Sequence, residues 1–295
     1  MKPPRILIIA GSDSGGGAGI QADIKAVTML GGHAMTAITA VTAQNSIGVQ
    51  DVHPVPVEMV IAQIDSVIDD LGIDAIKIGM IGSAQTAHAL ADRLQEVRDI
   101  PIVFDPVMVA TSGARLADVA TIAAFERLMA MARIITPNVP ELAVLTGLAV
   151  EEVDALEAAG QMLARRHGCA VFAKGGHLPD QPHDDAPMVH DLLIRASGVL
   201  EYRMPRIETR HSHGTGCTLA SAMATGIGRG LALEEAVDRA EAFVAGALFN
   251  APGFGKGHGP MGHAMGTTPF YHTLAAVNDW GKDADALAAQ WGDRA

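Results

Sequence analysis

Short apolar segments alternate with amphipathic segments along almost the whole chain, and this alternation restricts the fold more than any other feature. Residues 5–10 (RILIIA) are an apolar run of strand length, whereas apolar residues in 57–71 recur at helical spacing until Gly72. Repeated strand–helix alternation is typical of a mainly parallel sheet covered by helices on both faces. We therefore expect a three-layer α/β fold.

The same pattern predicts the remaining elements and the region where ligands bind. Further strands are predicted at 34–41, 74–78, 102–104, 133–135 and 170–173, a hairpin at 192–204, and helices at 18–30, 84–97, 153–167, 215–229 and 233–250. In doubly wound sheets ligands bind outside the carboxyl ends of the strands, so residues just after strands are the candidates for a site. No linker-like composition interrupts the pattern, which predicts a single domain over 1–266 and a C-terminal tail, 267–295, without an assigned role.

Charge and composition argue against several classes of partner. The formal net charge of −12 disfavours nucleic acid and anionic membranes as binding partners. The apolar stretch 6–10 is far too short to span a membrane, and it runs into a polar, glycine-rich segment unlike a secretory signal. Two cysteines, Cys169 and Cys217, cannot build a disulfide framework, so we expect a cytoplasmic protein.

A glycine-rich turn at 11–19 joins the first strand to the first helix. Such a turn lets the backbone approach a ligand closely and aims helix N–H groups at it, although a tight structural turn is an alternative. It matches neither the Gly-Lys-Ser/Thr phosphate loop nor the dinucleotide fingerprint. Asp23 lies one turn into the helix, where the helix dipole favours a carboxylate whether or not it binds a ligand.

Three further groups of polar residues follow predicted strands. Gln44 both donates and accepts hydrogen bonds, which suits the edge of a heterocycle as well as a loop contact. Asp105 suits either a Mg²⁺ ligand or an Asp-Pro turn. Asn138 and Glu141 are spaced for a hydrated Mg²⁺ and equally for a helix capping box.

The segment 211–218 (HSHGTGCT) is the most informative one, because it directly precedes a long predicted helix. Gly214, Thr215 and Gly216 are expected to present consecutive backbone N–H groups, which form an anion hole for a transferring phosphoryl group. Cys217 falls in the first helical turn, where the helix dipole lowers the pKa of a thiol, although such a cysteine is more often a small buried apolar residue.

Together these segments resemble the hydroxymethylpyrimidine/phosphomethylpyrimidine kinases of thiamin biosynthesis, a branch of the ribokinase-like superfamily. The resemblance covers about 5–263 and leaves the tail from Thr267 unmatched. It rests on seven segments in the expected order: GSDSGGGAGIQAD (11–23), AQN (43–45), KIGM (77–80), DPVM (105–108), TPNVPE (136–141), KGGH (174–177) and HGTGCT (213–218).

The resemblance implies a ribokinase-like fold and a substrate, 4-amino-5-hydroxymethyl-2-methylpyrimidine, phosphorylated by ATP to the monophosphate and then to the diphosphate. It implies that Asp23 and Gln44 hydrogen-bond the aminopyrimidine edge, with Met80 and Val107 packed on the ring. A homodimer is expected by analogy.

The resemblance also implies roles on the nucleotide side. Lys174 would neutralise the ATP phosphates beside Thr215. Gly255 and His258, in the glycine-rich segment 255–260 (GKGHGP), would lie near the nucleotide. Asp105 with Glu141 would organise Mg²⁺ through water. Cys217 occupies the position of the catalytic aspartate of sugar kinases in this superfamily.

Three other functions are alternatives to a hydroxymethylpyrimidine/phosphomethylpyrimidine kinase. A pyridoxal or pyridoxine kinase of the same branch is the nearest alternative, alone or as a second activity. A catalytically silent pyrimidine-binding protein would not need Lys174, Asp105, Glu141 and an anion hole. A nicotinamide-dependent dehydrogenase is disfavoured, because no acidic residue follows the second strand at the ribose-binding position.

Overall fold

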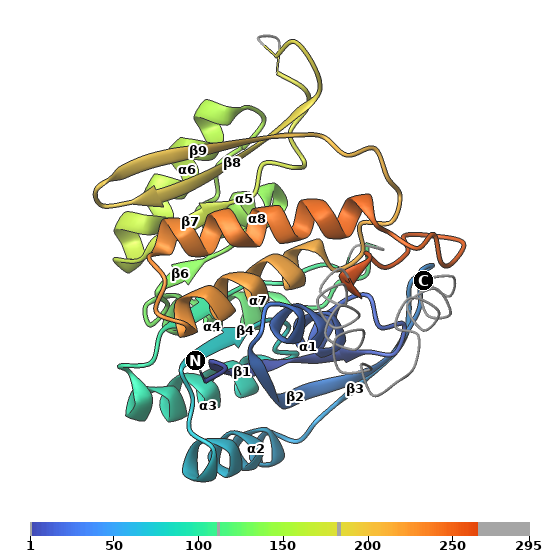
Figure 1. Cartoon of the computed structure of the whole chain (residues 1–295). Coiled ribbons are helices and arrows are strands. Elements are labelled where there is room, and N and C mark those ends of the chain that lie inside the picture. The colour runs from blue at the N-terminus through green and yellow to red at the C-terminus, as the bar shows by residue number, and fades with distance from the viewer. Residues whose placement is uncertain (1, 111–112, 182–183, 265–295) are drawn as a thin grey trace, which may run out of the picture.

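The computed structural model describes residues 2–110, 113–181 and 184–264 (Figure 1). Nine strands in these ranges form one sheet in the order β3-β2-β1-β4-β5-β6-β7-β8-β9. Their bounds are β1 Arg5–Asp13, β2 His33–Gln44, β3 Val49–Pro54, β4 Ala75–Ile78, β5 Ile102–Phe104, β6 Ile134–Ile135, β7 Ala170–Ala173, β8 Met188–Arg195 and β9 Gly198–Pro205.

The six central strands, from β2 to β7, run parallel, whereas β3, β8 and β9 are antiparallel to their neighbours at the two edges. Helices cover both faces, as Figure 1 shows for the side that carries α1, α7 and α8. These three are Gly19–Met29, Thr215–Gly228 and Leu233–Phe249. The other face carries α2 Val57–Asp70, α3 Ala84–Leu94, α4 Val119–Met129, α5 Val139–Thr146 and α6 Val153–His167, with a short 3-10 helix at Gln95–Val97.

Strand β1 shows why the sequence pattern succeeds. Leu7 and Ile9 pack under α2 and α3, whereas Ile6 and Ile8 pack under α1 and α7, and all four are fully buried. A strand buried on both faces has no polar alternation, so it reads as a continuous apolar run. The predicted mainly parallel sheet between two helical layers is confirmed.

Two elements were not predicted from the sequence. Strand β3 is exposed along most of its length at the sheet edge, so its residues (VQDVHP) carry no apolar run. Helix α4 follows an irregular segment and was not assigned. In addition, β1 and β2 extend to Asp13 and Gln44, so the glycine-rich segment begins inside a strand.

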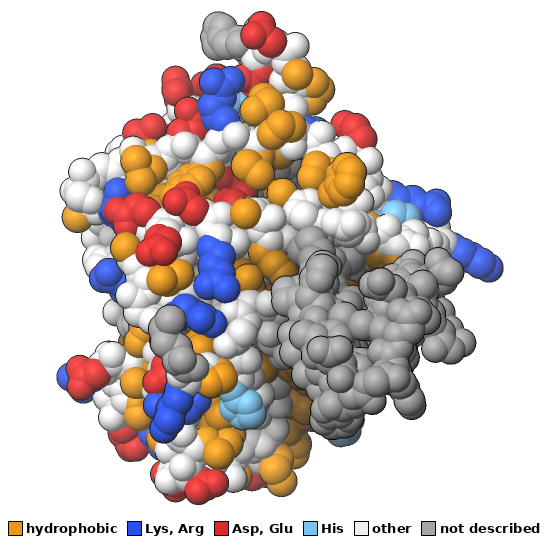
Figure 2. Space-filling view, viewed as in Figure 1, with side chains coloured by type: hydrophobic (Ala, Val, Ile, Leu, Met, Phe, Trp, Pro, Cys, Tyr) orange, Lys and Arg blue, Asp and Glu red, His pale blue; other side chains and the backbone are white. Residues whose placement is uncertain are grey.

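The surface is mixed in character on the face seen in Figure 2, where acidic, basic and apolar side chains are interspersed. No helix within the described ranges is both long and apolar enough to cross a membrane. The predicted tail, 267–295, and the domain boundary at residue 266 lie outside the described residues.

Candidate active site

A cavity of about 710 Å³ opens at the carboxyl ends of the central strands. Its lining includes Gly11 from β1, Gln44 from β2, Asp105 after β5, Lys174 after β7 and Cys217 from the first turn of α7. These residues are far apart in the sequence, and the parallel sheet brings them together because the carboxyl ends of its strands meet at one edge. The cavity is therefore where the sequence analysis places the site.

The cavity lining includes Gln44, Met80 and Val107, the residues predicted to contact the acceptor. Met80 packs so closely on Gly11 that a Cβ at position 11 would collide with the methionine methyl group. The main chain of Gln44 exchanges hydrogen bonds with the Ser14 hydroxyl, at 2.8 Å from its N–H and 2.7 Å to its C=O. Gln44 thus has a well-defined backbone position at the cavity wall.

The glycine-rich turn folds around a carboxylate of the chain itself. Asp13 accepts hydrogen bonds from the N–H groups of Gly15, Gly17 and Ala18 at 2.8 to 3.0 Å, and its Oδ2 lies 2.9 Å from His213 Nε2. Burial raises the pKa of Asp13, but the hydrogen bonds from His213 and the backbone outweigh it and lower the pKa below its ordinary value. These N–H groups, which precede α1, serve Asp13 rather than a ligand, and this favours the alternative of a tight structural turn.

Asp23 does not line the cavity, and its predicted contact with the substrate is wrong. The side chain is fully buried, with both carboxylate oxygens 2.9 Å from Lys77 Nζ and Oδ1 accepting from the Ser221 hydroxyl at 2.7 Å. Burial lowers the pKa of Lys77, but the charge of Asp23, its hydrogen bond and the charges of neighbouring groups together outweigh burial and raise the pKa. The position of Asp23 one turn into α1 therefore places its carboxylate beside Lys77 in the interior.

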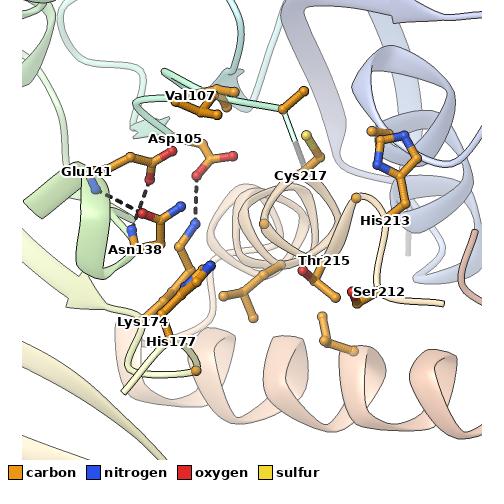
Figure 3. A pocket seen from close by; sticks show the side chains of 18 of the residues that line it. Asp105, Val107, Asn138, Glu141, Lys174, His177, Ser212, His213, Thr215 and Cys217 are labelled. Atoms are coloured by element: carbon orange, nitrogen blue, oxygen red, sulfur yellow. Dashed lines mark hydrogen bonds and ion pairs between the residues drawn. The ribbon is translucent and has the colours of Figure 1, made fainter. Parts of the chain in front are cut away.

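Lys174 and Asp105 form an ion pair at the centre of the cavity, with Nζ and Oδ1 3.0 Å apart (Figure 3). Asp105 Oδ1 also accepts from the Thr136 hydroxyl at 3.0 Å. Burial lowers the pKa of Lys174, but Asp105 and Glu141 outweigh it and raise the pKa, so the ammonium is charged. A Cβ at Gly216 would lie 3.0 Å from Lys174 Nζ, so a larger residue at the start of α7 would press on this pair.

The N-terminus of α7 supplies backbone donors beside this ion pair. Gly214 is the N-cap at φ 86°, a conformation that favours glycine. The Thr215 N–H donates to Ser212 O at 3.3 Å. Among the described residues, the N–H groups of Gly214, Gly216 and Cys217 have no backbone acceptor outside the helix and are available for an anion.

The thiol of Cys217 lies at the cavity wall, and its electrostatic state differs from the prediction. Burial raises the pKa of Cys217 to about 11, which outweighs the lowering by the Lys77 charge and by a hydrogen bond from the Gly19 N–H. The negative charges of Asp23 and Asp105 raise the pKa of Cys217 further. The thiol is therefore protonated at neutral pH, and the expectation that the helix dipole lowers its pKa is wrong.

Glu141 begins α5 in a capping box, one of the two alternatives that its spacing allowed. The Asn138 side chain accepts from the Glu141 N–H, and Glu141 Oε2 accepts from the Asn138 N–H, both at 2.9 Å. Burial raises the pKa of Glu141 to about 7, assisted by the Asp105 charge and opposed by Lys174. Asp105 and Glu141 both accept hydrogen bonds from the protein, so their carboxylates are better suited to binding Mg²⁺ through water molecules than to binding it directly. No cluster of three or more His, Cys, Asp or Glu suited to a metal occurs among the described residues.

The cavity is also lined by a loop after β7 that sequence reasoning did not assign to the site. His177 in this loop lies beside Lys174 (Figure 3). The Arg206 guanidinium donates to the carbonyls of Gly176 and Leu178 at 2.9 and 3.0 Å and so holds the loop in place. Arg206 follows β9 without any recognisable motif, so only the folded arrangement identifies it.

Two buried acids also line the cavity. Asp191 Oδ1 accepts from the Gly175 N–H at 2.6 Å, and Glu241 projects from α8, only 9% exposed, without a hydrogen bond from another described residue. Burial raises the pKa of Glu241 to about 8, assisted by the charge of Asp191. The sequence analysis did not include Glu241. The available sign was an acidic residue on the apolar face of the predicted helix 233–250.

Gly255 and His258 lie outside the cavity lining, contrary to their predicted proximity to the nucleotide. Both residues are exposed in a loop that packs on the turn around Ser46. A Cβ at Gly255 would collide with the Ser46 side chain. His258 Nδ1 lies 3.2 Å from the Arg210 carbonyl. The glycines of 255–260 therefore allow close packing of loop on loop.

Sequence comparison identifies relatives over most of the chain. A model of the phosphomethylpyrimidine kinase family matches residues 13–262. The hydroxymethylpyrimidine/phosphomethylpyrimidine kinase of Streptomyces coelicolor is 46% identical over 265 residues, covering 89% of this chain and 95% of that protein. The thiamine biosynthesis bifunctional protein ThiED of Geobacter sulfurreducens is 42% identical over 261 residues, covering 88% of this chain, which spans 52% of that longer protein.

Solved structures give the same result. The phosphomethylpyrimidine kinase of Clostridium difficile 630 matches with a TM-score of 0.72 at 33% identity, covering 82% of this chain and 98% of that one. The ADP complex of Bacillus subtilis pyridoxal kinase matches with a TM-score of 0.80 at 29% identity, covering 89% and 98%. The ribokinase-like fold predicted from the sequence is confirmed, and the chain belongs to the phosphomethylpyrimidine kinase family.

Proposed function

We propose that this protein transfers the γ-phosphoryl group of ATP to the hydroxymethyl group of 4-amino-5-hydroxymethyl-2-methylpyrimidine, and then phosphorylates the monophosphate. The observation that carries the proposal is the position of the α7 N-terminus. Its unengaged N–H groups belong to residues that line the cavity. In Figure 3 this terminus lies between the charged pair Lys174–Asp105 and His213, the residue that contacts Gln44. A phosphoryl group at this point would have the acceptor on one side and the nucleotide on the other.

Phosphoryl transfer depends on positioning and charge stabilisation more than on covalent chemistry. Backbone N–H groups at Gly214, Gly216 and Cys217 would hydrogen-bond the oxygens of the transferring group. The Lys174 ammonium, held 3.0 Å from Asp105, would neutralise phosphate charge. Because these donors are fixed by a helix terminus and an ion pair, little reorganisation is needed during the reaction.

Mg²⁺ is part of the proposal because nucleotide phosphates are normally presented to kinases with it. Asp105 and Glu141 would hold the ion through water, and the ion would supply positive charge to the phosphate oxygens. ATP as donor is supported by the nucleotide complexes of the related pyridoxal kinases, which contain ADP or AMP-PCP.

Cys217 would contact the acceptor without acting as a base, because its raised pKa keeps the thiol protonated. In the first step the hydroxymethyl proton can pass late to an oxygen of the transferring phosphoryl group, after the bond from the alcohol oxygen to phosphorus has begun to form. In the second step the acceptor is a phosphate oxygen that is already ionised and needs no base. A neutral side chain at position 217 therefore suits both steps.

Pyridoxal kinase activity is the second candidate, supported by the likeness to Bacillus subtilis pyridoxal kinase over nearly the whole of that chain. The substrate would again present a hydroxymethyl group to the α7 N-terminus. It differs at the ring edge facing Gln44, so the two activities are separated by what this amide recognises.

We further propose a cytoplasmic homodimer, by analogy with kinases of this class and in keeping with two free cysteines, Cys169 and Cys217. Light scattering of the purified protein at micromolar concentration tests the dimer. A monomer mass across the concentration range would exclude it.

The activity itself is tested by incubating the protein with ATP and Mg²⁺ together with either the hydroxymethylpyrimidine or pyridoxal, and identifying the products by mass. We expect mono- and diphosphorylated pyrimidine. Phosphorylation of pyridoxal alone would move the substrate assignment to the second candidate, and binding without turnover of ATP would exclude both.

A further inference from the structure

The hydroxyl of Thr42 determines which amide atom of Gln44 can face it. Thr42 Oγ1 lies 2.8 Å from the Ser12 carbonyl oxygen, which can only accept, so the hydroxyl proton points to Ser12. The same Oγ1 lies 3.3 Å from the Gln44 amide, and only its lone pairs remain for this contact. The amide atom beside Thr42 must therefore be the donor, which is nitrogen.

His213 leads to the same orientation by an independent route. Its Nε2 lies 2.9 Å from Asp13 Oδ2, and this carboxylate already accepts backbone hydrogen bonds and is ionised, so Nε2 carries the proton. The other amide atom of Gln44 lies 3.1 Å from this Nε2. It must be an acceptor, which is oxygen.

In the structure Oε1 is placed beside Thr42 and Nε2 beside His213. Both contacts are satisfied only when these two amide atoms are exchanged, so that Oε1 faces His213 and Nε2 faces Thr42. The opposite assignment would set the amide nitrogen against a protonated ring nitrogen and the amide oxygen against a hydroxyl with no proton left. Oxygen and nitrogen of an amide are nearly equal in size, so their placement follows from hydrogen-bond partners rather than from shape. The hydrogen bonds from Thr42 to Ser12 and from His213 to Asp13 therefore require the same orientation of the Gln44 amide.

We infer that Asp13 and His213 are positioning residues that lock the Gln44 amide in this orientation, so that the amide reads the order of donor and acceptor along the substrate edge. The inference rests on the proposed function for the identity of that edge. Asp13 is 2% exposed and His213 is 7% exposed, so the lock is shielded from water, while half-buried Gln44 reaches the cavity. The main chain of Gln44 is already held by Ser14, which leaves the amide torsion as the freedom that His213 removes.

The locked amide keeps one N–H and one oxygen lone pair for the substrate. An aminopyrimidine edge presents an amino donor beside a ring nitrogen acceptor, and its hydroxymethyl group must still face α7. The corresponding oxo compound presents a carbonyl acceptor beside a ring N–H, which is the reverse order. A free amide could rotate to match it, whereas a locked amide cannot, and unpaired buried polar groups are strongly disfavoured.

The test compares kcat/KM for the amino substrate with kcat/KM for its 4-oxo analogue in three proteins. We expect the wild type to prefer the amino compound strongly, His213→Leu to lower this preference at least tenfold, and His213→Gln to retain most of it. The glutamine side chain can still donate to both Asp13 and Gln44, whereas leucine fills similar space without a donor. A ratio is insensitive to the fraction of folded enzyme, so a purely structural loss would not change it.

An unchanged preference in His213→Leu would overturn the inference. Gln44→Ala provides the matched control, because the lock acts only through this amide. Adding His213→Leu to Gln44→Ala should lower the preference less than twofold further. If the two substitutions instead act multiplicatively, His213 does not work through Gln44 and the inference fails.

A measurement without substrate separates this inference from the proposed function. Long-range ¹H–¹⁵N NMR of the free protein should show a protonated Nε2 for His213, assigned by its absence in His213→Gln. A deprotonated Nε2 would overturn the inference whatever the enzyme phosphorylates. A protonated Nε2 in a protein that does not turn over the pyrimidine would instead keep the lock and reject the proposed substrate.

Discussion

The ammonium of Lys77 lies 2.9 Å from both carboxylate oxygens of Asp23, and both side chains are completely buried. The pair lies beneath the cavity and joins α1 to β4, while Ser221 links it to α7. Because a buried charge without a partner is strongly disfavoured, the two residues depend on each other. The pair therefore supports the site from behind rather than contacting a ligand.

Replacing Lys77 by methionine is expected to lower the free energy of unfolding by about 3–5 kcal/mol, because Asp23 is left buried without its partner. Urea denaturation at pH 7 measures this. The control is Arg127→Ala, which removes an ion pair with Asp92 whose side chains are 37% and 70% exposed and should change stability by at most ~1 kcal/mol. A Lys77→Met protein as stable as the control would contradict the prediction.

Substituting Gly216 by alanine is expected to lower kcat/KM by about tenfold, because the added methyl group would lie 3.0 Å from Lys174 Nζ and push the ammonium away from its position. Steady-state kinetics with saturating pyrimidine and varied ATP measures the effect. Gly176→Ala is the matched control in the same cavity, since its Cβ would make an ordinary contact 3.9 Å from Val189. Equal losses in the two variants would show that Gly216 is not special.

Replacing Cys217 by aspartate is expected to impair the second phosphorylation more than the first, by at least ~tenfold. An ionised carboxylate near the α7 N-terminus repels the anionic monophosphate but not the neutral alcohol. Both acceptors are assayed separately, with Cys217→Ser as a neutral control that should keep both activities. Equal impairment of the two steps would rule out charge repulsion as the reason for a cysteine here.

Glu241 is expected to make the protein less stable as pH rises. Burial raises the pKa of its carboxyl group from the ordinary 4.5 to about 8. The folded state therefore binds the proton more tightly than the unfolded chain, and this contribution is complete below about pH 4.5 and is lost as pH approaches 8. Asp191, whose pKa burial raises to about 6, and Glu141, whose pKa burial raises to about 7, lose similar contributions at lower pH. The part due to Glu241 is therefore the difference between the wild type and a variant that lacks only this carboxyl group.

Glu241→Gln keeps the shape of the side chain and cannot ionise, so its stability should fall less steeply than that of the wild type between pH 6 and 9. At pH 9 it should exceed the wild type by about 1–3 kcal/mol, measured by urea denaturation at four pH values. Glu235→Gln removes one negative charge from an exposed position of the same helix and serves as the control. Parallel curves for wild type and Glu241→Gln would contradict the prediction.

The first strand and the segment before α7 show what local sequence can determine. Strand β1 was predicted from a continuous apolar run, which burial on both faces explains. The start of α7 was predicted from the glycine-containing segment before a helical pattern, and Gly214 is its N-cap at a positive φ. Local periodicity and backbone conformation depend on neighbouring residues in the chain, so they can be inferred without the fold. Strand β3 was missed for the same reason, since an exposed edge strand has no periodic apolar signal.

The partners of charged and polar side chains were decided by the tertiary structure. Asp23 follows the glycine-rich turn as a ligand-binding residue would, yet Lys77, 54 positions away, pairs with it in the interior. The thiol of Cys217 begins a helix, yet its burial raises the pKa that the helix dipole was expected to lower. His213 and Asp13 are in contact although they lie 200 positions apart in the sequence.

The sequence by itself determined the layers, the strand ends and the residues gathered there, because these follow from local pattern and sheet geometry. Which of those residues face the cavity, and in which charge state, was decided by packing, because burial and long-range contacts control desolvation and hydrogen bonding.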